Sequence, residues 1–158
     1  TGKNGLDTVL KIIPLQDPTK IADENNLPLP VPIAAAIHEC QVLKTVNSLK
    51  DYRTQASPLC WTGFNQITDI MVVQGSYPQN LIKSWLQWRK SHEGFNSCPD
   101  KYMGDSKFLV ILMEYGGQSL ESEPVKNLRQ VGSIIRQLVH ALSLAESRIE
   151  FEHRDLYQ

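Results

Sequence analysis

A His-Arg-Asp-Leu tetrad, residues 153–156, carries the residue types that proton transfer requires. The carboxylate of Asp155 could accept the proton of a hydroxyl group while that hydroxyl attacks a phosphoryl group. The tetrad follows a long amphipathic pattern and precedes Tyr157 and Gln158. We therefore take Asp155 as a candidate general base and ask which elements would position it.

A single lysine interrupts the first apolar strand pattern, which spans residues 8–13. Lys11 shares one face of this predicted strand with Val9 and Ile13. Burying an ammonium group among apolar side chains costs free energy unless an anion meets it. Lys11 is therefore either an edge-strand lysine whose head stays in water or a cation with a specific anionic partner.

A candidate partner lies on the next predicted helix, which begins at Ile33 behind Pro32 and closes between Asn47 and Asp51. Its apolar stripe recurs at spacings of three and four residues: Ile33, Ile37, Cys40, Leu43 and Val46. Glu39 lies at the border of that stripe. It is either a solvated glutamate or the anion that meets Lys11 across a strand-helix contact.

Two further strands are predicted. Residues 66–73 form a β-rich run before the turn signal Gln74-Gly-Ser-Tyr-Pro78, and residues 107–113 are apolar on both faces, as a central strand must be. A short helix is predicted around residues 81–89. Three stretches are predicted to be loops, the last of them exposed and polar: 15–32, 57–65 and 90–106.

The strand over 107–113 leads into Glu114-Tyr-Gly-Gly117. Consecutive glycines let a backbone turn sharply and approach a ligand closely. The residues alone leave a ligand-binding turn and an ordinary turn both open. Pro124 then opens a predicted helix that runs to Ser147 with a broad apolar face, and such a face requires a packing partner.

Composition excludes several classes of partner. The 158 residues, 41% of them hydrophobic, can build one core, and a net charge of −1 gives no footprint for nucleic acid or an anionic membrane. No apolar run has the length of a membrane span. Cys40, Cys60 and Cys98 are an odd number without metal-ligand spacing, which favours free thiols in the cytosol or nucleus.

The order of these parts resembles the first half of a protein kinase: a lysine strand, a glutamate helix, a strand ending in a Gly-Gly turn, a long helix, then the tetrad. Three segments resemble the haspin family of divergent eukaryotic-like kinases: Val73-Gln-Gly-Ser-Tyr-Pro78, Tyr115-Gly-Gly117 with Leu120-Glu121, and Phe151-Glu-His-Arg-Asp-Leu156. The resemblance covers nearly the whole chain.

The resemblance implies a role for each candidate residue. Lys11 would contact the α- and β-phosphates of ATP, and Glu39 would hold that ammonium in place. Asp155 would be the catalytic base, braced by His153 and Arg154. Met113 would be the gatekeeper of the adenine pocket. The hinge that follows would read the adenine edge through its backbone groups: Glu114, Tyr115, Gly116, Gly117, Gln118 and Ser119.

The same resemblance implies ATP and Mg²⁺ as cofactors, a threonine of a histone tail as the substrate during mitosis, and a nuclear, chromosome-associated location, with the cytoplasm as the alternative. Two departures from the family are visible. Ser119 stands where an acidic residue is common, and Tyr157 and Gln158 stand where the family has His-Trp-Gly-Asn. Because the glycine-rich loop and both metal ligands fall outside residues 1–158, we assign no metal ligand and expect this polypeptide alone to be inactive.

The expected fold class is therefore α+β, a partial protein kinase domain over residues 1–158. It comprises an N-terminal lobe over 1–113 with an antiparallel sheet and the Glu39 helix, a hinge over 114–119, and the start of a helical lobe over 120–158. The long helix should expose apolar surface to the rest of a kinase lobe, a chaperone or another partner. The alternatives are a pseudokinase remnant that binds a nucleotide or protein, and an unrelated α+β protein.

Overall fold

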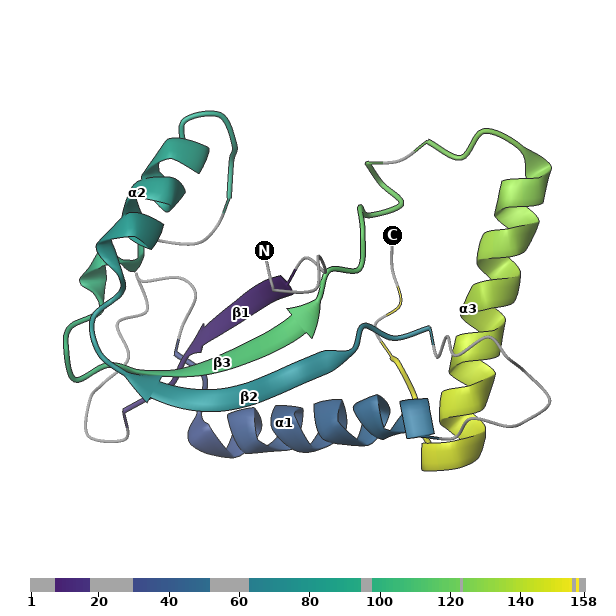
Figure 1. Ribbon diagram of the computed structural model, residues 1–158, viewed down its shortest axis with the longest axis horizontal. Helices are drawn as coiled ribbons and strands as arrows, with labels where there is room; N and C mark the ends of the chain where they lie inside the picture. The colour runs from purple at the N-terminus through teal and green to yellow at the C-terminus, as the bar shows by residue number, and fades with distance from the viewer. Residues whose placement is uncertain are drawn as a thin grey trace. The chain divides into compact units, whose positions relative to one another are not determined.

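A computed structural model describes residues 8–17, 30–51, 63–94, 98–122, 124–154 and 156 of the chain. Strands and helices alternate in the order β1 (Thr8–Pro14), α1 (Ile33–Asn47), β2 (Ile67–Gln74), α2 (Gln79–Trp88), β3 (Lys107–Glu114) and α3 (Leu128–Ile149) (Figure 1). Short 3₁₀ turns, η1 (Ser48–Asp51) and η2 (Pro99–Lys101), follow α1 and precede β3. Among these residues no helix is long and apolar enough to cross a membrane.

The three strands form one antiparallel sheet in the order β1-β3-β2 (Figure 1). At one end of β3, the N–H of Leu15 donates to Lys107 at 2.8 Å and the N–H of Gly75 donates to Ser106 at 2.9 Å. At the other end, the N–H of Glu114 donates to Gln66 at 2.9 Å. The ends of β1 and β2 thus meet the start of β3, which confirms the α+β class and the central strand.

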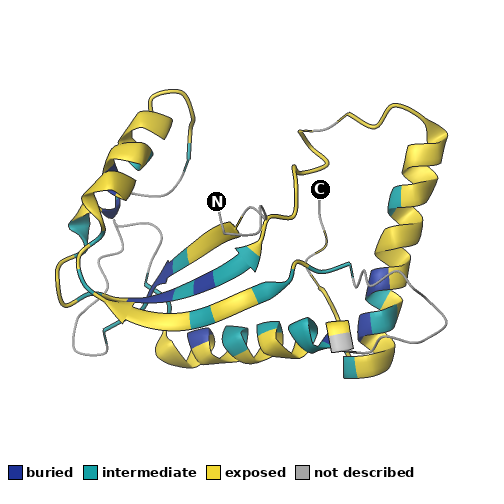
Figure 2. Cartoon of the chain, viewed as in Figure 1, coloured by how far each residue is buried: buried dark blue, intermediate teal, exposed yellow. Residues whose placement is uncertain are grey.

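The described chain divides into two compact units. We call residues Leu10–Cys40 and Asp69–Leu112 the sheet unit, and residues Thr1–Val9, Gln41–Thr68 and Met113–Gln158 the hinge unit. In the sheet unit the core is built on β3, where Ile111 is 0% exposed (Figure 2). Its other buried apolar residues are Ile13, Ala36, Ile82, Phe108 and Leu109, and those of the hinge unit are Leu49, Ala141 and Ala145.

The predicted stripe of α1 is wrong only in its first half. Ile33 and Ile37 are 45% and 54% exposed and Ala36 is 5% exposed, whereas Cys40, Leu43 and Val46 are half-buried as predicted. Apolar content misplaced the first turns, because Ala36 lies four residues before Cys40 and fits the same helical periodicity as Ile33 or Ile37. Residues three apart share a helix face, so the burial of Ala36 carries Glu39 to the inner side of α1.

The last helix begins later than predicted. Pro124 lies outside it, and α3 starts at Leu128 behind Asn127. The side chain of Asn127 accepts a hydrogen bond from the N–H of Gln130 at 3.0 Å, which satisfies one of the free donors of the first turn. The cap, and not the preceding proline, therefore sets the boundary.

Two predicted loops contain more structure than expected. The ends of the 15–32 stretch pair as an isolated parallel bridge between Leu15 and Val31. Within 90–106, η2 buries Pro99, and the ring of Tyr102 packs 5.2 Å from that of Phe108. The stretch is therefore not uniformly exposed. Of the predicted 57–65 loop, residues 63–65 are neither helix nor strand, and the rest lies outside the described residues.

Candidate functional site

Lys11 and Glu39 form an ion pair between β1 and α1. The Nζ atom of Lys11 lies 2.7 Å from Oε1 of Glu39, and the two side chains are 52% and 32% exposed. The lysine therefore has the specific anionic partner that one of the two interpretations predicted. A pair this accessible to water typically contributes at most about 1 kcal/mol to stability. Its main effect is to hold the ammonium of a long flexible side chain at one place on the sheet.

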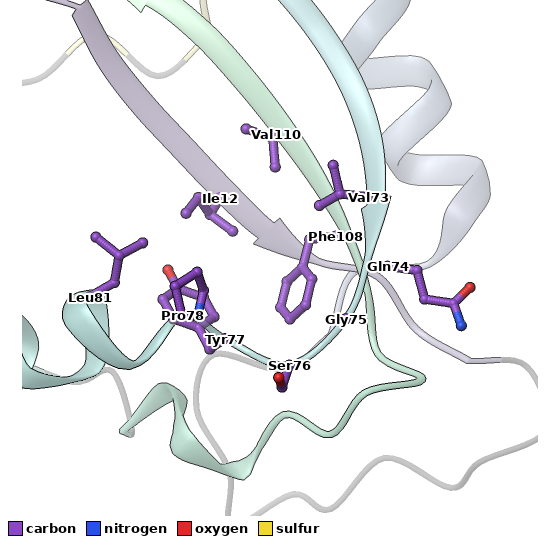
Figure 3. Close-up of a pocket in the computed structure, with 10 residues that line it drawn as sticks. All are labelled: Ile12, Val73, Gln74, Gly75, Ser76, Tyr77, Pro78, Leu81, Phe108 and Val110. Carbon is purple, nitrogen blue, oxygen red and sulfur yellow. The ribbon is translucent and has the colours of Figure 1, made fainter.

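A cavity lies on the opposite side of the sheet from this pair. Side chains alternate along a strand, so Ile12 points away from the face that carries Lys11. Ile12 lines a cavity of about 190 Å³ together with Val110 and Phe108 of β3 (Figure 3). Its lining is almost wholly apolar and holds no charged side chain. This cavity is therefore distinct from a phosphate site at Lys11.

The segment Val73–Pro78, singled out in the sequence, lines the same cavity. Gly75 has a φ of 154°, which side-chain-bearing residues rarely adopt, and this lets β2 turn toward α2. The ring of Tyr77 packs edge-on against Phe108 with centroids 5.7 Å apart. Within the described residues the segment therefore acts as a packing turn.

Tyr77 and Tyr102 form the polar edge of this aromatic cluster. Burial raises the pKa of both phenols above the ordinary value of 10.0, and for Tyr102 the neighbouring Tyr77 raises it further. Among the residues that the structure describes, the buried hydroxyl of Tyr102 has no hydrogen-bond partner. Burial of such a group is unfavourable, so the cluster stabilises the fold through its rings and not through its hydroxyls.

The predicted hinge leaves β3 as an exposed backbone segment in the hinge unit. Met113 and Glu114 are the last residues of β3, and the N–H of Glu114 is held by Gln66. From Tyr115 to Gln118, no backbone group takes part in a hydrogen bond in the part of the chain that the structure describes. A planar heterocycle with a polar edge can form hydrogen bonds with such free backbone donors and acceptors.

The two hinge glycines differ in what constrains them. A Cβ atom on Gly116 would lie 2.5 Å from both Nδ2 and Oδ1 of Asn65, whereas one on Gly117 would meet nothing within 4 Å. Gly117 instead has a φ of 92°, in the left-handed region that favours glycine. Gly116 thus allows a close approach, and Gly117 allows a turn.

Ser119 is engaged in a local turn. The hydroxyl of Ser122 donates to the carbonyl of Ser119 at 2.9 Å, and the two hydroxyls lie 3.3 Å apart. An uncharged side chain held in this way offers a weaker contact to a cation or a ribose than the acidic residue common in the family.

The start of the tetrad lies in the hinge unit, just after α3. Arg154 has a φ of 56°, and its Nε and Nη2 atoms lie 2.7 and 2.6 Å from Oε2 of Glu152. The ring of His153 packs edge-on against Phe151 at 6.0 Å. Glu152 was not among the predicted residues, although a glutamate two positions before an arginine was visible in the sequence.

Asp155 lies outside the described residues. The predicted meeting of Asp155 with Lys11 and Glu39 therefore stays a prediction. Lys11 and Glu39 belong to the sheet unit, and the hinge residues, His153 and Arg154 belong to the hinge unit. Among the described residues no group of three or more His, Cys, Asp or Glu could hold a metal ion.

Sequence reasoning missed two asparagines whose side chains contact distant backbone within the hinge unit. The carboxamide of Asn47 bonds both backbone groups of Ile67, and that of Asn65 lies against Gly116. The first contact joins residues 20 positions apart and the second joins residues about 50 positions apart, so no local sequence pattern predicts either. The nearest signal was the Gly-Gly pair itself, because a glycine often marks a close approach by another residue.

Comparison with known proteins adds a family likeness to this geometry. Residues 1–158 match the family model described as haspin like kinase domain. A serine/threonine-protein kinase haspin homolog of Arabidopsis thaliana is 36% identical over 113 residues, which cover 72% of this chain and 18% of the relative.

Two animal relatives are similar in the same way. The haspin homolog of Drosophila melanogaster is 28% identical over 151 residues, which cover 96% of this chain and 25% of the relative. The serine/threonine-protein kinase haspin of Bos taurus is 34% identical over 97 residues, which cover 60% and 12%. The chain spans a quarter or less of the length of these three relatives.

Proposed function

Because the chain belongs to the haspin-like kinase family, we propose that it is the nucleotide-binding part of a serine/threonine protein kinase. The observation that carries the proposal is the ion pair between Lys11 and Glu39. Kinases place a strand lysine on the α- and β-phosphates of ATP and hold it with a helix glutamate. The pair leaves the ammonium half exposed, so it is accessible to a polyphosphate.

The hinge supports the same proposal from the adenine side. The backbone groups of Tyr115 to Gln118 make no hydrogen bonds with other described residues and are carried on an exposed segment. In the proposed complex they bond the adenine edge beside Met113. ATP bound this way would supply the phosphoryl group, with Asp155 as the base that takes the proton of a serine or threonine hydroxyl.

Family membership also supports a proposal about the substrate and the location. We propose a threonine in a histone tail as the phosphoryl acceptor during mitosis, and the nucleus, on chromosomes, as the place of action. In the kinase pattern Mg²⁺ bridges the β- and γ-phosphates, and its protein ligands lie C-terminal to the position of Gln158. The chain's own share is thus the adenine contact, the lysine contact and the base.

The decisive experiment is nucleotide-dependent thermal stabilisation of the 158-residue polypeptide, with ATP as the probe and with and without Mg²⁺. A ligand at about 100 times its Kd stabilises the folded state by about 2.7 kcal/mol. We expect Lys11→Ala to abolish the stabilisation and Glu39→Gln to reduce it. The matched control is Lys83→Ala, which removes an exposed lysine of α2 in the same unit. A wild-type chain that no nucleotide stabilises would overturn the proposal.

Catalysis by these residues alone is a separate matter. Without residues that clamp the metal, the developing charge on the phosphoryl group loses contacts typically worth about 3 kcal/mol each. We therefore expect no transfer of labelled phosphate from ATP to a histone-tail peptide by this polypeptide. Turnover that disappears in Asp155→Asn would show the opposite.

The exposed side chains of α3 favour a second candidate function, a non-catalytic binding module. Leu128, Ile135 and Val139 are 88%, 54% and 60% exposed on this helix. Stabilisation of the chain by a protein partner, with none by ATP in wild type, would favour the module. Stabilisation by ATP that depends on Lys11 favours the kinase.

A further inference from the structure

One short segment, Phe64–Ile67, contacts α1, the end of β3, the hinge and Phe151 within the hinge unit. The chain there has just left the 52–62 stretch, which lies outside the described residues, and is entering β2. We propose that this 64–67 segment is a positioning element, in which Asn65 sets the backbone path of the hinge by acting through Gly116. The inference rests on the proposed function, because it gives the hinge its role as adenine reader.

The segment is first fixed to the end of α1. Oδ1 of Asn47 accepts the N–H of Ile67 at 2.9 Å, and Nδ2 of Asn47 donates to the carbonyl of Ile67 at 3.3 Å. A carboxamide that bonds both backbone groups of one residue imitates a neighbouring strand. Ile67 is therefore held at the start of β2 by the side chain of the last residue of α1.

The segment then fixes where the hinge begins. The carbonyl of Gln66 accepts the N–H of Glu114 at 2.9 Å, which is the last such bond before the hinge backbone becomes free. The side chain of Gln66 turns back to donate to the carbonyl of Phe64 at 3.3 Å. This bond within the segment keeps the Gln66 carbonyl aimed at the hinge.

Asn65 makes the contact that shapes the hinge itself. Its carboxamide lies so close to Gly116 that a Cβ atom there would be 2.5 Å from Nδ2 and Oδ1 and 2.9 Å from Cγ. Gly116 does not have a left-handed φ, so its backbone conformation is open to alanine. The close approach of Asn65, and not backbone strain, is the reason that glycine fits this position.

Phe64 extends the contact to the start of the tetrad. Its ring packs edge-on against Phe151 with centroids 5.8 Å apart, and Phe151 packs against His153 at 6.0 Å. Both contacts lie within the hinge unit. One segment thus contacts the hinge and the residues that lead to Asp155, while it carries no cationic side chain for a phosphate.

The test measures the hinge directly in the absence of nucleotide. Backbone amide chemical shifts of residues 114–119 report the conformation of the hinge, whose amides from Tyr115 to Gln118 are not hydrogen-bonded within the described residues. We expect Asn65→Ala to shift the amide signals of Gly116 and Gly117 by more than their line width without lowering the midpoint of thermal unfolding, because Asn65 is exposed. Asn80→Ala, at an exposed asparagine of α2, is the matched control and leaves the hinge unchanged.

A double-variant cycle separates positioning from a general structural role. Gly116→Ala should also shift the other hinge amide signals, because the new methyl group displaces the Asn65 carboxamide. In the double variant, Gly116→Ala should add little to the shift that Asn65→Ala causes alone, since the atoms that clash are gone. Gly104→Ala, where a Cβ meets nothing within 4 Å, should show no such interaction with Asn65→Ala.

The ATP-dependent thermal shift gives the second readout. We expect Asn65→Ala to weaken it roughly tenfold in apparent affinity at unchanged stability of the nucleotide-free chain. Additive changes in the hinge amide shifts across the cycle, or an ATP-dependent thermal shift identical to wild type, would overturn the positioning role. If the cycle behaves as expected but ATP stabilises no variant and not the wild type, the proposed function fails while the hinge contact stands.

Discussion

The sheet unit and the hinge unit bury their apolar residues to very different extents. In the sheet unit β3 supplies Phe108, Leu109 and Ile111, which are 4%, 2% and 0% exposed. In the hinge unit the 22-residue helix α3 has two buried residues, Ala141 and Ala145, both small (Figure 2). Its large side chains, such as Ile135 and Val139, are more than half exposed.

The difference shows which unit can complete a hydrophobic core with the described residues alone. A strand between two others is covered on both edges and both faces by nearby chain, so its core closes locally. A long amphipathic helix needs another layer, and among the described residues none covers the face of α3 that carries Ile135. The hinge unit is therefore held more by specific polar contacts, such as those of Asn47, than by buried area.

The largest expected effect contrasts two isoleucines. Ile111→Ala should lower the free energy of unfolding by about 3 kcal/mol, because it leaves a cavity beneath the central strand. Ile135→Ala should change it by less than about 0.5 kcal/mol, because the side chain is already in water. Urea unfolding of both variants measures the contrast. A loss at Ile135 as large as that at Ile111 would break the comparison, since it would mean that the helix face is covered.

The next effect sharpens the claim that polar contacts hold the hinge unit. Asn127→Ala removes the N-cap of α3 and should lower its stability by about 1 kcal/mol, whereas Asn127→Ser should keep most of it. Far-ultraviolet circular dichroism during thermal unfolding follows the helix. An alanine variant as stable as the serine variant would show that the cap contributes nothing here.

A third effect concerns a group that the sheet unit buries at a cost. Tyr102→Phe removes a hydroxyl that is buried without a partner, and should raise the free energy of unfolding by about 1 kcal/mol. Because burial raises the pKa of this phenol above 10.0, the neutral form is favoured in the folded chain. The free energy of unfolding is therefore unaffected by this ionisation below pH 10.0. It falls as the pH rises from 10.0 to the raised pKa of Tyr102 in the folded chain.

Ultraviolet titration of tyrosine ionisation checks that direction. The folded chain should ionise Tyr77 and Tyr102 at higher pH than the urea-unfolded chain. A Tyr102→Phe variant less stable than wild type would mean that the hydroxyl is satisfied.

The smallest effect lies within α3. Gly132 is in the helix interior, and a Cβ atom there would meet nothing within 4 Å. Gly132→Ala should therefore stabilise the chain by about 0.5 to 1 kcal/mol through reduced freedom of the unfolded state. The control is Gly117→Ala, which the left-handed φ of 92° makes unfavourable. Thermal unfolding should shift in opposite directions for the two variants.

Some of this structure was predictable because its signals are local. The run over 107–113 is apolar on both faces, which only a central strand requires, and β3 is that strand. Lys11 was predicted to be either an edge-strand lysine with its head in water or a cation with an anionic partner; β1 is an edge strand and Lys11 is 52% exposed, and its partner is Glu39, the carboxylate at the edge of the next apolar stripe. The ion pair confirms that argument, while the catalytic roles of Lys11, Glu39 and Asp155 stay predictions.

Other features escaped prediction for physical reasons. Ile33 and Ile37 fit a helical stripe as well as Ala36 does, and only packing against the sheet decides which face is buried. The start of α3 depends on the N-cap residue Asn127, but in the sequence Pro124 was the stronger helix-start signal. The contact between Asn65 and Gly116 joins residues that are distant in the sequence, so the hydrophobic periodicity of either segment does not predict it.

Two left-handed residues after α3, one at its C-cap and one within the tetrad, limit which substitutions the chain tolerates. Glu150 and Arg154 have φ values of 53° and 56°, although neither is glycine. The left-handed conformation costs roughly 1 kcal/mol for ordinary residues and more for β-branched ones. A saturation scan of residues 150–154 that selects for stability should therefore enrich glycine and asparagine, and deplete valine and isoleucine, at positions 150 and 154. The positions between them should tolerate more residue types.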